Sequence, residues 1–362
     1  MASGGRPPLA GGTVTGVAHG IDDVARVAGV STATVSRALR GLPNVSAATR
    51  ERVRSAAAQL GYVASPSAAS LASGRTRTIG LLTPFVNHWF FSNVIEGAEQ
   101  ALRAQGYDAL LHTFEVSRRT PRLRVDPDVL RRRVDGILIV GFPLDSAEVD
   151  SLLSLGHPLI FIGSSVPGQV TVRLDDLATG REATEHLIGL GHRRIGHISG
   201  SPDDVTPFSP PVARRRGWLT ALEDAGLPHG PELEVHGHFD LDGGRESMHL
   251  LFRQCPDITA VFAASDEMAM GAILAARDRG LRVPEDLSVI GIDGHDLGEL
   301  VGLTTMVQPA VEEGAKAASL LLQMIAGVSV PGDVVYQTEL IERGSTGPPR
   351  SASADETKLL PA

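Results

Sequence analysis

The sequence predicts an α/β protein in which a small helical N-terminal domain precedes two lobes of doubly wound parallel sheet. Residues 21–60 carry three short helical patterns in succession. After Thr78, short aliphatic runs alternate with amphipathic helical stretches, which is typical of parallel strands covered by helices on both faces. This alternation lasts about 270 residues, more than one such unit needs, so we expect two lobes.

The three N-terminal helices follow from apolar spacing and from residues that begin or end helices. Gly29 and Val30 turn the chain, Ser31 is an N-cap candidate for the second helix, and the third begins near Ser46 and ends at Gly61. The expected buried positions are Val24, Val27 and Ala28 in the first helix, Val35, Ala38 and Leu39 in the second, and Val53, Ala57 and Leu60 in the third.

The later elements are predicted from their hydrophobic runs. Buried-strand candidates begin at Ile79, Ile137, Leu159, Arg194, Ala260 and Ser288, and helical stretches cover 93–104, 179–190, 215–223 and 267–278. Composition shifts predict a disordered arm at 1–19, the helical domain at 20–64, a linker or marginal helix at 65–77, the core at 78–345 and a disordered tail at 346–362.

Composition excludes several classes of protein. The chain is 42% hydrophobic and 21% charged, and no apolar run reaches the length of a membrane span. The lone cysteine, Cys255, excludes an internal disulfide or a cysteine zinc site, and we find no phosphate loop, nucleophile elbow or zinc-protease helix. We therefore expect no enzyme activity, catalytic residue, metal or cofactor. The N-terminus lacks the apolar core of a secretory signal, so a cytoplasmic location is expected.

Charge is unevenly distributed along the chain. The formal net charge is −9, yet residues 1–76 hold eight basic and three acidic groups, which leaves −14 on the remainder. A basic segment ahead of an acidic core favours a nucleic-acid contact confined to the N-terminal domain.

A helix, a tight glycine turn and a second helix that opens with small polar residues form a pattern suited to the DNA major groove. Short side chains at the start of the second helix allow close approach to base edges, and Arg37 can reach a guanine with two hydrogen bonds. The alternative is a three-helix bundle with solvated arginines, because this topology is not unique to DNA binding.

Longer motifs make the assignment specific. DDVARVAGVSTATVSRAL from Asp22 and NVSAATRERVRSAAAQLGY ending at Tyr62 resemble the headpiece of the lactose-repressor/galactose-repressor family. EHLIGLGHRRIGHISG, ASDEMAMGAILAARDRGLRVPEDLSVIGIDG and LTTMVQP resemble its regulatory core, so the resemblance covers roughly residues 20–345. It implies a homodimeric transcriptional regulator, usually a repressor, that binds near-palindromic operator DNA under control of a small ligand. A sugar is the expected ligand, and a purine or nucleoside is the alternative. The rival class is a sugar-binding receptor or enzyme without DNA activity.

The resemblance implies particular DNA contacts. Thr32, Ala33 and Arg37 would face the bases, and the backbone contacts would be Ser31, Thr34, Ser36, Asn44, Ser46, Thr49 and Tyr62. For Ser46 and Thr49 the alternative is capping of the third helix. The linker would form a hinge helix in the minor groove, with Leu71 wedged between base steps and Ala68 beside it.

The resemblance also implies two periplasmic-binding-protein-like lobes joined by three crossovers, with the ligand between them. The first lobe would comprise about 78–158 and 305–330, and the second about 159–304 and 331–345. The ligand contacts implied are Asp145, Arg214, Ser265 and Asp293, with Trp89, Phe90 and Phe239 as aromatic walls. Trp89 and Phe90 could equally belong to the core. Ser265 stands where the family often has asparagine, which leaves the ligand's identity open.

Overall fold

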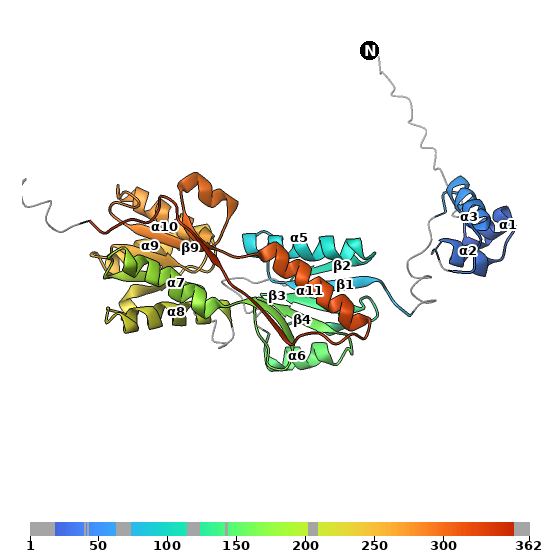
Figure 1. The fold of residues 1–362 in the computed structure, drawn as a ribbon, viewed down its shortest axis with the longest axis horizontal. Helices are drawn as coiled ribbons and strands as arrows, with labels where there is room; N and C mark the ends of the chain where they lie inside the picture. The colour runs from blue at the N-terminus through green and yellow to red at the C-terminus, as the bar shows by residue number, and fades with distance from the viewer. Residues whose placement is uncertain are drawn as a thin grey trace, which may run out of the picture. The chain divides into compact units, whose positions relative to one another are not determined.

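The computed structural model describes residues 19–39, 41, 43–62, 74–113, 124–141, 144–201 and 209–350. The chain divides into two compact units, residues 1–76 and 77–362 (Figure 1). In the described parts, no helix combines the length and apolar character needed to cross a membrane. Most of the predicted arm, most of the predicted linker and the end of the predicted tail lie outside the described residues.

The first unit is a three-helix domain made of α1 (Ile21–Ala28), α2 (Thr32–Leu39) and α3 (Ala47–Gln59). Gly29 ends α1 in the left-handed conformation, at φ 65°, which glycine adopts without strain. Val24, Val35, Ala38 and Val53 are fully buried between the helices. Val27, expected in this core, is instead 43% exposed, because Ala25 takes the inward position of α1.

The first lobe of the second unit is a six-stranded parallel sheet in the order β11-β5-β4-β3-β1-β2. Its strands are β1 (Thr78–Thr83), β2 (Asp108–Thr113), β3 (Gly136–Val140), β4 (Leu159–Ile162), β5 (Val170–Leu174) and β11 (Asp333–Tyr336). Its helices are α5 (Trp89–Ala104), the short η1 (Pro127–Val129), α6 (Ser146–Leu153) and α11 (Ala310–Ile325).

The second lobe is a six-stranded sheet in the order β12-β10-β9-β8-β6-β7, parallel except for the antiparallel β10–β12 pair. Its strands are β6 (Ile195–Ser199), β7 (Glu234–His236), β8 (Ala260–Ala263), β9 (Ser288–Asp293), β10 (Thr304–Val307) and β12 (Glu339–Ile341). Its helices are α7 (Asp176–Gly189), α8 (Pro210–Asp224), η2 (Pro231–Leu233), α9 (Leu241–Gln254), α10 (Asp266–Asp278) and η3 (Asp296–Val301).

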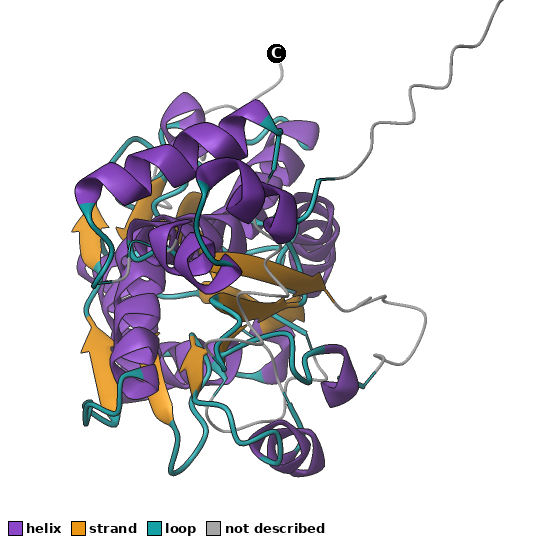
Figure 2. Ribbon diagram, turned by 90° about the vertical axis from the view of Figure 1, so that its right-hand side faces the viewer, coloured by secondary structure: helices purple, strands orange, loops and turns teal. Residues whose placement is uncertain are grey.

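Both faces of the first sheet are buried, as a doubly wound sheet requires. Leu138 and Val140 of β3 point into a core beneath α5 and α11, whereas Ile137 and Ile139 point into a second core with Leu152 of α6. Figure 2 shows helices on both sides of the strands. The continuous aliphatic runs of the sequence therefore reflect strands covered on two sides, and the predicted fold class is confirmed.

The predicted lobe boundaries were wrong in three places. β4 and β5 extend the first sheet, so the first crossing follows Leu174 rather than residue 158. β10 pairs with β9 in the second sheet, and β11 pairs with β5 in the first. A hydrophobic run identifies a buried strand but not its neighbour, which is set by tertiary pairing. The chain crosses between the lobes after β5, after β10 and after β11.

The predicted tail also begins too early. Thr346 Oγ1 lies 3.1 Å from His186 Nε2 and 3.0 Å from Thr304 Oγ1. The Gly347 amide donates to Ser288 Oγ at 3.0 Å. Residues 346–350 are thus held against the second lobe by polar side chains. The biased composition of this segment gives no sign of these contacts.

Candidate functional site

Helix α2 exposes the side that the sequence assigned to base contacts. Ala33 and Arg37 are exposed and one turn apart, whereas Val35 and Ala38 face the core. Thr32 and Ser36 are half-buried on the flanks of this surface. Because Arg37 is exposed, its guanidinium can present hydrogen-bond donors to an outside acceptor.

Four of the predicted backbone-contact residues form two helix caps of the same design. Ser31 Oγ accepts from the Thr34 amide at 3.2 Å and pairs with Thr34 Oγ1 at 2.9 Å, at the start of α2. Ser46 Oγ accepts from the Thr49 amide at 3.1 Å and pairs with Thr49 Oγ1 at 2.9 Å, at the start of α3. Each cap satisfies an amide that the helix leaves unpaired. The capping alternative for Ser46 and Thr49 is therefore present in the structure.

The other predicted DNA contacts are placed differently. Asn44 is exposed, with a left-handed φ of 69° in the turn before α3. Tyr62 packs against the helical core and is half-buried. Ala68 and Leu71 lie outside the described residues.

Three predicted ligand contacts meet at the carboxyl ends of the strands of the second sheet. Arg214 of α8 is buried and donates from Nη1 to the Ala264 carbonyl at 2.6 Å, just beyond β8. The next residue, Ser265, caps α10 through its bond to the Met268 amide at 3.3 Å. Asp293 ends β9 and accepts from the Asp266 amide at 3.3 Å. The carboxyl edge of a parallel sheet is where such folds bind ligands.

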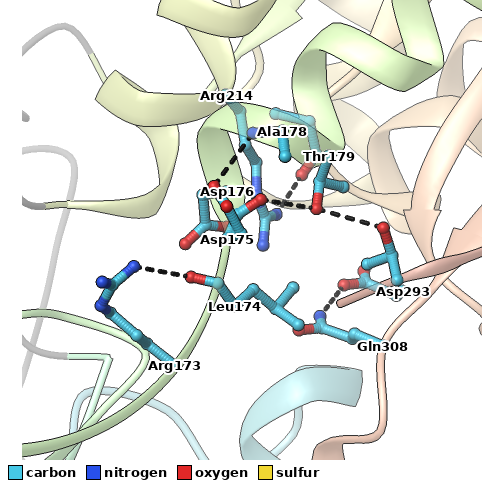
Figure 3. A network of polar contacts seen from close by, with 11 residues as sticks. Arg173, Leu174, Asp175, Asp176, Ala178, Thr179, Arg214, Asp293 and Gln308 are labelled. Carbon is cyan, nitrogen blue, oxygen red and sulfur yellow. Dashed lines mark hydrogen bonds and ion pairs between the residues drawn. The ribbon is translucent and has the colours of Figure 1, made fainter. Parts of the chain in front are cut away.

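Residues at the crossings between the lobes complete this buried cluster (Figure 3). Arg214 Nε donates to Asp176 Oδ1 at 2.8 Å, and Asp176 begins α7 directly after the first crossing. Gln308, at the second crossing, donates through its amide nitrogen to Asp293 Oδ1. Figure 3 shows the Arg214 side chain directed at Asp176 and that of Gln308 directed at Asp293. Asp176 and Gln308 were not predicted from the sequence, although Asp175 and Asp176 directly follow β5 and Gln308 directly follows β10.

Burial dominates the electrostatics of the cluster. Removal from water raises the pKa of Asp176, and the adjacent Arg214 charge opposes this. Burial together with the neighbouring Asp266 raises the pKa of Asp293 well above its usual range. Asp293 also has a φ of 140°, a strained conformation for a residue with a side chain.

Asp266 anchors the cluster to the sheet, and it too was not predicted from the sequence. Its carboxylate accepts from the amides of Gly294 and His295 at 2.9 and 2.8 Å and from Thr305 Oγ1 at 2.7 Å. Burial raises its pKa to about 6. This carboxylate fixes the loop after β9, so we assign it a structural role.

Trp89 and Phe90 open α5 in the first lobe, Phe239 follows β7 in the second, and Trp89 joins the two lobes. The Trp89 amide donates to Glu267 Oε1 at 3.0 Å, and Trp89 Nε1 donates to Asp296 Oδ1 at 2.8 Å. Phe90 packs partly on the first-lobe core, close to Gly163 after β4. Phe239 follows β7 and lies against Gly200 after β6. Trp89 is therefore half-buried in a contact between lobes.

Asp145 is not brought to the cluster. It caps α6 by accepting from the Glu148 amide at 2.8 Å, and it pairs with Arg124 Nη2 at 2.9 Å. Its side chain is 44% exposed. The capping-box spacing from Asp145 to Glu148 was the available sign of this role.

A helix-turn-helix domain joined to a two-lobed α/β domain defines the class of transcriptional regulators with a periplasmic-binding-protein-like core. Residues 20–65 match the family described as bacterial regulatory proteins, lacI family, and residues 184–346 match the periplasmic binding protein-like domain. The chain belongs to the lacI family of bacterial regulatory proteins.

The relatives and solved structures agree with this assignment. The HTH-type transcriptional repressor CytR of Escherichia coli K12 is 36% identical over 90% of this chain and 95% of its own length. The HTH-type transcriptional regulator CelR of Thermobifida fusca is 35% identical over 90% and 97%. A CelR–cellobiose complex superposes with a TM-score of 0.67, at 32% identity, over 90% of this chain and 99% of that one. The lac repressor dimer bound to operator and the anti-inducer ONPF gives 0.79, at 27% identity, over 91% and 99%.

Proposed function

We propose that this protein is a cytoplasmic transcriptional repressor that binds a near-palindromic operator as a homodimer and is controlled by a small polar ligand, most simply a sugar. The observation that carries the proposal is the coexistence of two sites on one chain. One is the exposed face of α2 around Arg37, and the other is the buried cluster of Arg214, Asp293 and Gln308.

The DNA half of the proposal rests on the shape and charge of α2. Ala33 is small enough to let the helix approach base edges, and Arg37 supplies a fork of donors that matches guanine. The two hydroxyl caps fix the starts of α2 and α3, where amides point outward and favour phosphate. The solved lac repressor dimer is bound to operator, and its fold matches this chain over 91% of its residues.

The ligand half rests on the chemistry of the buried cluster. A guanidinium and a carboxylate at the edge of one sheet can bind adjacent hydroxyl groups as donor and acceptor. Phe239, at the same edge, offers a flat apolar surface for the CH face of a sugar ring. Ser265, Trp89 and Phe90 remain proposed contacts, and Asp145 would join them only by leaving its ion pair with Arg124. The related CelR was solved with cellobiose.

Control would operate through the contacts between the lobes. The Trp89 links to Glu267 and Asp296 join the lobes from the N-terminus of α5, while Gln308 joins them at a crossing. A ligand that binds one arrangement of the lobes more tightly shifts the population toward it. Operator DNA must then change the ligand affinity by the same factor as the ligand changes the operator affinity.

Selection of binding sites from random DNA with the purified full-length protein tests the DNA half. We expect a near-palindrome with half-sites about one helical turn, ~34 Å, apart. Enrichment of no sequence would refute DNA reading, and enrichment of single half-sites would refute the dimer.

Calorimetry against sugars, sugar phosphates and nucleobases, followed by operator-release titration, tests the ligand half. A sugar that binds and alters operator affinity is the expected result. Binding of a nucleobase alone would replace the sugar by the purine alternative.

A further inference from the structure

Helix α11 carries a buried carboxyl group on the face that packs against the first lobe. Ala310, Gly314 and Ala317 on this face are small and apolar, whereas Glu313 among them is 0% exposed. Neither carboxyl oxygen of Glu313 has a hydrogen-bond partner in the part of the chain that the structure describes. A buried polar group without a partner is costly, so this carboxyl requires an explanation.

Helix α11 packs closely on α5 directly beside Glu313. A Cβ at Gly314 would lie 2.0 Å from the Val94 carbonyl oxygen, so α11 and α5 touch through their backbones here. Lys316, on the same helix, is exposed and points away from the buried face. Helix α11 therefore places no cation of its own beside Glu313.

The surroundings of Glu313 are rich in acceptors and poor in donors. Its carboxyl interacts electrostatically with Asp176 of α7, Asp293 at the end of β9 and Arg214 of α8. Arg214 already bonds to Asp176 and the Ala264 carbonyl. Gln308 donates to Asp293, and its own Oε1 has no partner among the described residues. Three buried acceptor atoms, two on Glu313 and one on Gln308, thus lack donors beside the proposed ligand cluster.

The pKa of Glu313 reflects the same excess of nearby carboxyl groups. Burial, together with the nearby Asp176 and Asp293, raises the pKa of Glu313 to about 8, and the Arg214 charge opposes this increase. Tyr336 of β11 also senses the charge, since burial and the two glutamates of α11 raise its pKa. A positive group placed beside Glu313 would restore the carboxylate form.

We propose that the ligand of this core carries a primary ammonium group, and that Glu313 and the side-chain oxygen of Gln308 bind it. An ammonium has three N–H donors, which matches the three acceptor atoms without donors. The chemical class is a small polyol with a protonated amine, such as an amino sugar or an amino nucleoside. This inference rests on the proposed function, because it uses the same cluster of Arg214, Asp293 and Gln308.

The test is calorimetry of the full-length protein against matched pairs that differ by the amine. The probes are glucosamine and glucose, galactosamine and galactose, and 5′-amino-5′-deoxyadenosine and adenosine. We expect at least one amine to bind about tenfold or more tightly than its neutral partner, which corresponds to ~1.4 kcal/mol. Binding should release a proton from Glu313 to the buffer, so the measured heat should vary with the buffer's ionisation enthalpy.

Two variants assign the effect to the buried carboxyl. Glu313→Gln keeps the shape of the side chain and should abolish both the amine preference and the proton release. Glu312→Gln changes the exposed neighbour on the same helix and should leave both unchanged. If Glu313→Gln does not fold, the buffer dependence of amine binding by the natural protein decides the question.

Three outcomes would overturn the inference: no amine binding more tightly than its neutral partner, no binding in any pair, or an unchanged preference in Glu313→Gln. A neutral member that binds at least as tightly as its amine partner and releases operator would overturn this inference while the proposed function stands. Failure of operator selection would instead overturn the proposed function and leave the amine preference measurable.

Discussion

Arg37 is the side chain of α2 with the longest reach from the exposed surface. We expect Arg37→Ala to lose about 1–3 kcal/mol of discrimination at one base pair of each half-site, because a two-bonded arginine–guanine contact contributes that much. Competition binding between the selected operator and single-base variants measures this loss. Arg52→Ala, exposed on α3, is the control and should leave base preference intact. Equal preference in natural protein and Arg37→Ala would remove the base-reading role.

Residues of the buried cluster around Arg214 could be predicted individually only where a family motif contains them. Arg214, Ser265 and Asp293 were identified from the family resemblance, and the structure brings them together. Asp176 and Gln308 acquire their roles from chain crossings, whose positions the sequence did not reveal. Glu313 was not predicted for another reason. Acidic residues are common in the first turn of a helix, so the sequence does not show which of Glu312 and Glu313 is buried.

At the scale of elements, the capping role of Ser46 at the start of α3 can be tested separately from its proposed DNA contact. Ser46→Ala removes the acceptor for the Thr49 amide and should destabilise α3 by about 1 kcal/mol. Hydrogen exchange of the α3 amides in the full-length protein without DNA measures this. Ser55→Ala, at an exposed position within the helix, is the control. Unchanged exchange would show that the serine contributes nothing as a cap.

Three helix pairs of the core approach each other through glycines. One glycine from each helix contacts the partner's backbone: Gly97 and Gly314 between α5 and α11, Gly180 and Gly217 between α7 and α8, and Gly244 and Gly271 between α9 and α10. At Gly97 a Cβ would lie 1.9 Å from the Val311 carbonyl oxygen. The pairs therefore depend on the absence of side chains at six positions.

Substitution of one such glycine should separate a helix pair. We expect Gly97→Ala to lower the free energy of unfolding by about 1–3 kcal/mol or more, because the backbone of α11 cannot yield as a side chain would. Urea denaturation followed by circular dichroism measures the change. Gly189→Ala, in α7 with nothing near its Cβ, is the matched control and should be neutral or slightly stabilising. A Gly97→Ala protein as stable as the control would contradict the close approach.

Six of the twelve strands that the structure describes were predicted from the sequence, whereas the grouping of strands into two sheets was not. The aliphatic run at Leu159 predicted a buried strand, and β4 occupies it. Its assignment to the second lobe failed because strands of both sheets are covered on two faces and look alike. The edge strand β2 has no fully buried residue and was not predicted for that reason.

At the scale of the whole molecule, a titratable pair joins the two lobes. His88 Nδ1 lies 3.0 Å from Glu267 Oε2 of α10 and 2.9 Å from the Phe239 carbonyl. The hydrogen bond that His88 donates to the Glu267 carboxylate raises the pKa of His88 above its usual 6.5, partial burial opposes this, and Asp240 adds a smaller increase. The joined form binds the proton more tightly, so this link is fully present below pH 6.5 and is lost as pH rises through the raised pKa.

We therefore expect the contact between lobes to loosen as pH rises from about 6 to about 8, the range in which histidine titrates. Trp89 follows His88 and bonds to Glu267, so tryptophan emission should shift to longer wavelength across this range. His88→Gln should remove the pH dependence, and His229→Gln, at an exposed histidine, should retain it. An identical shift in His88→Gln would assign the titration to another group.

The return of the chain to the first lobe has a consequence for biosynthesis. α11 and β11 complete that lobe, yet the ribosome makes them after the whole series from α7 to β10. Until residue 325 has been synthesised, Leu138, Ile160 and the other side chains beneath α11 lack their cover. The nascent first lobe thus presents an apolar surface while the second lobe is being made, which invites capture by a chaperone or aggregation. A nonsense mutation near codon 300 would leave that surface permanently open, and so would produce an insoluble fragment rather than a shorter repressor.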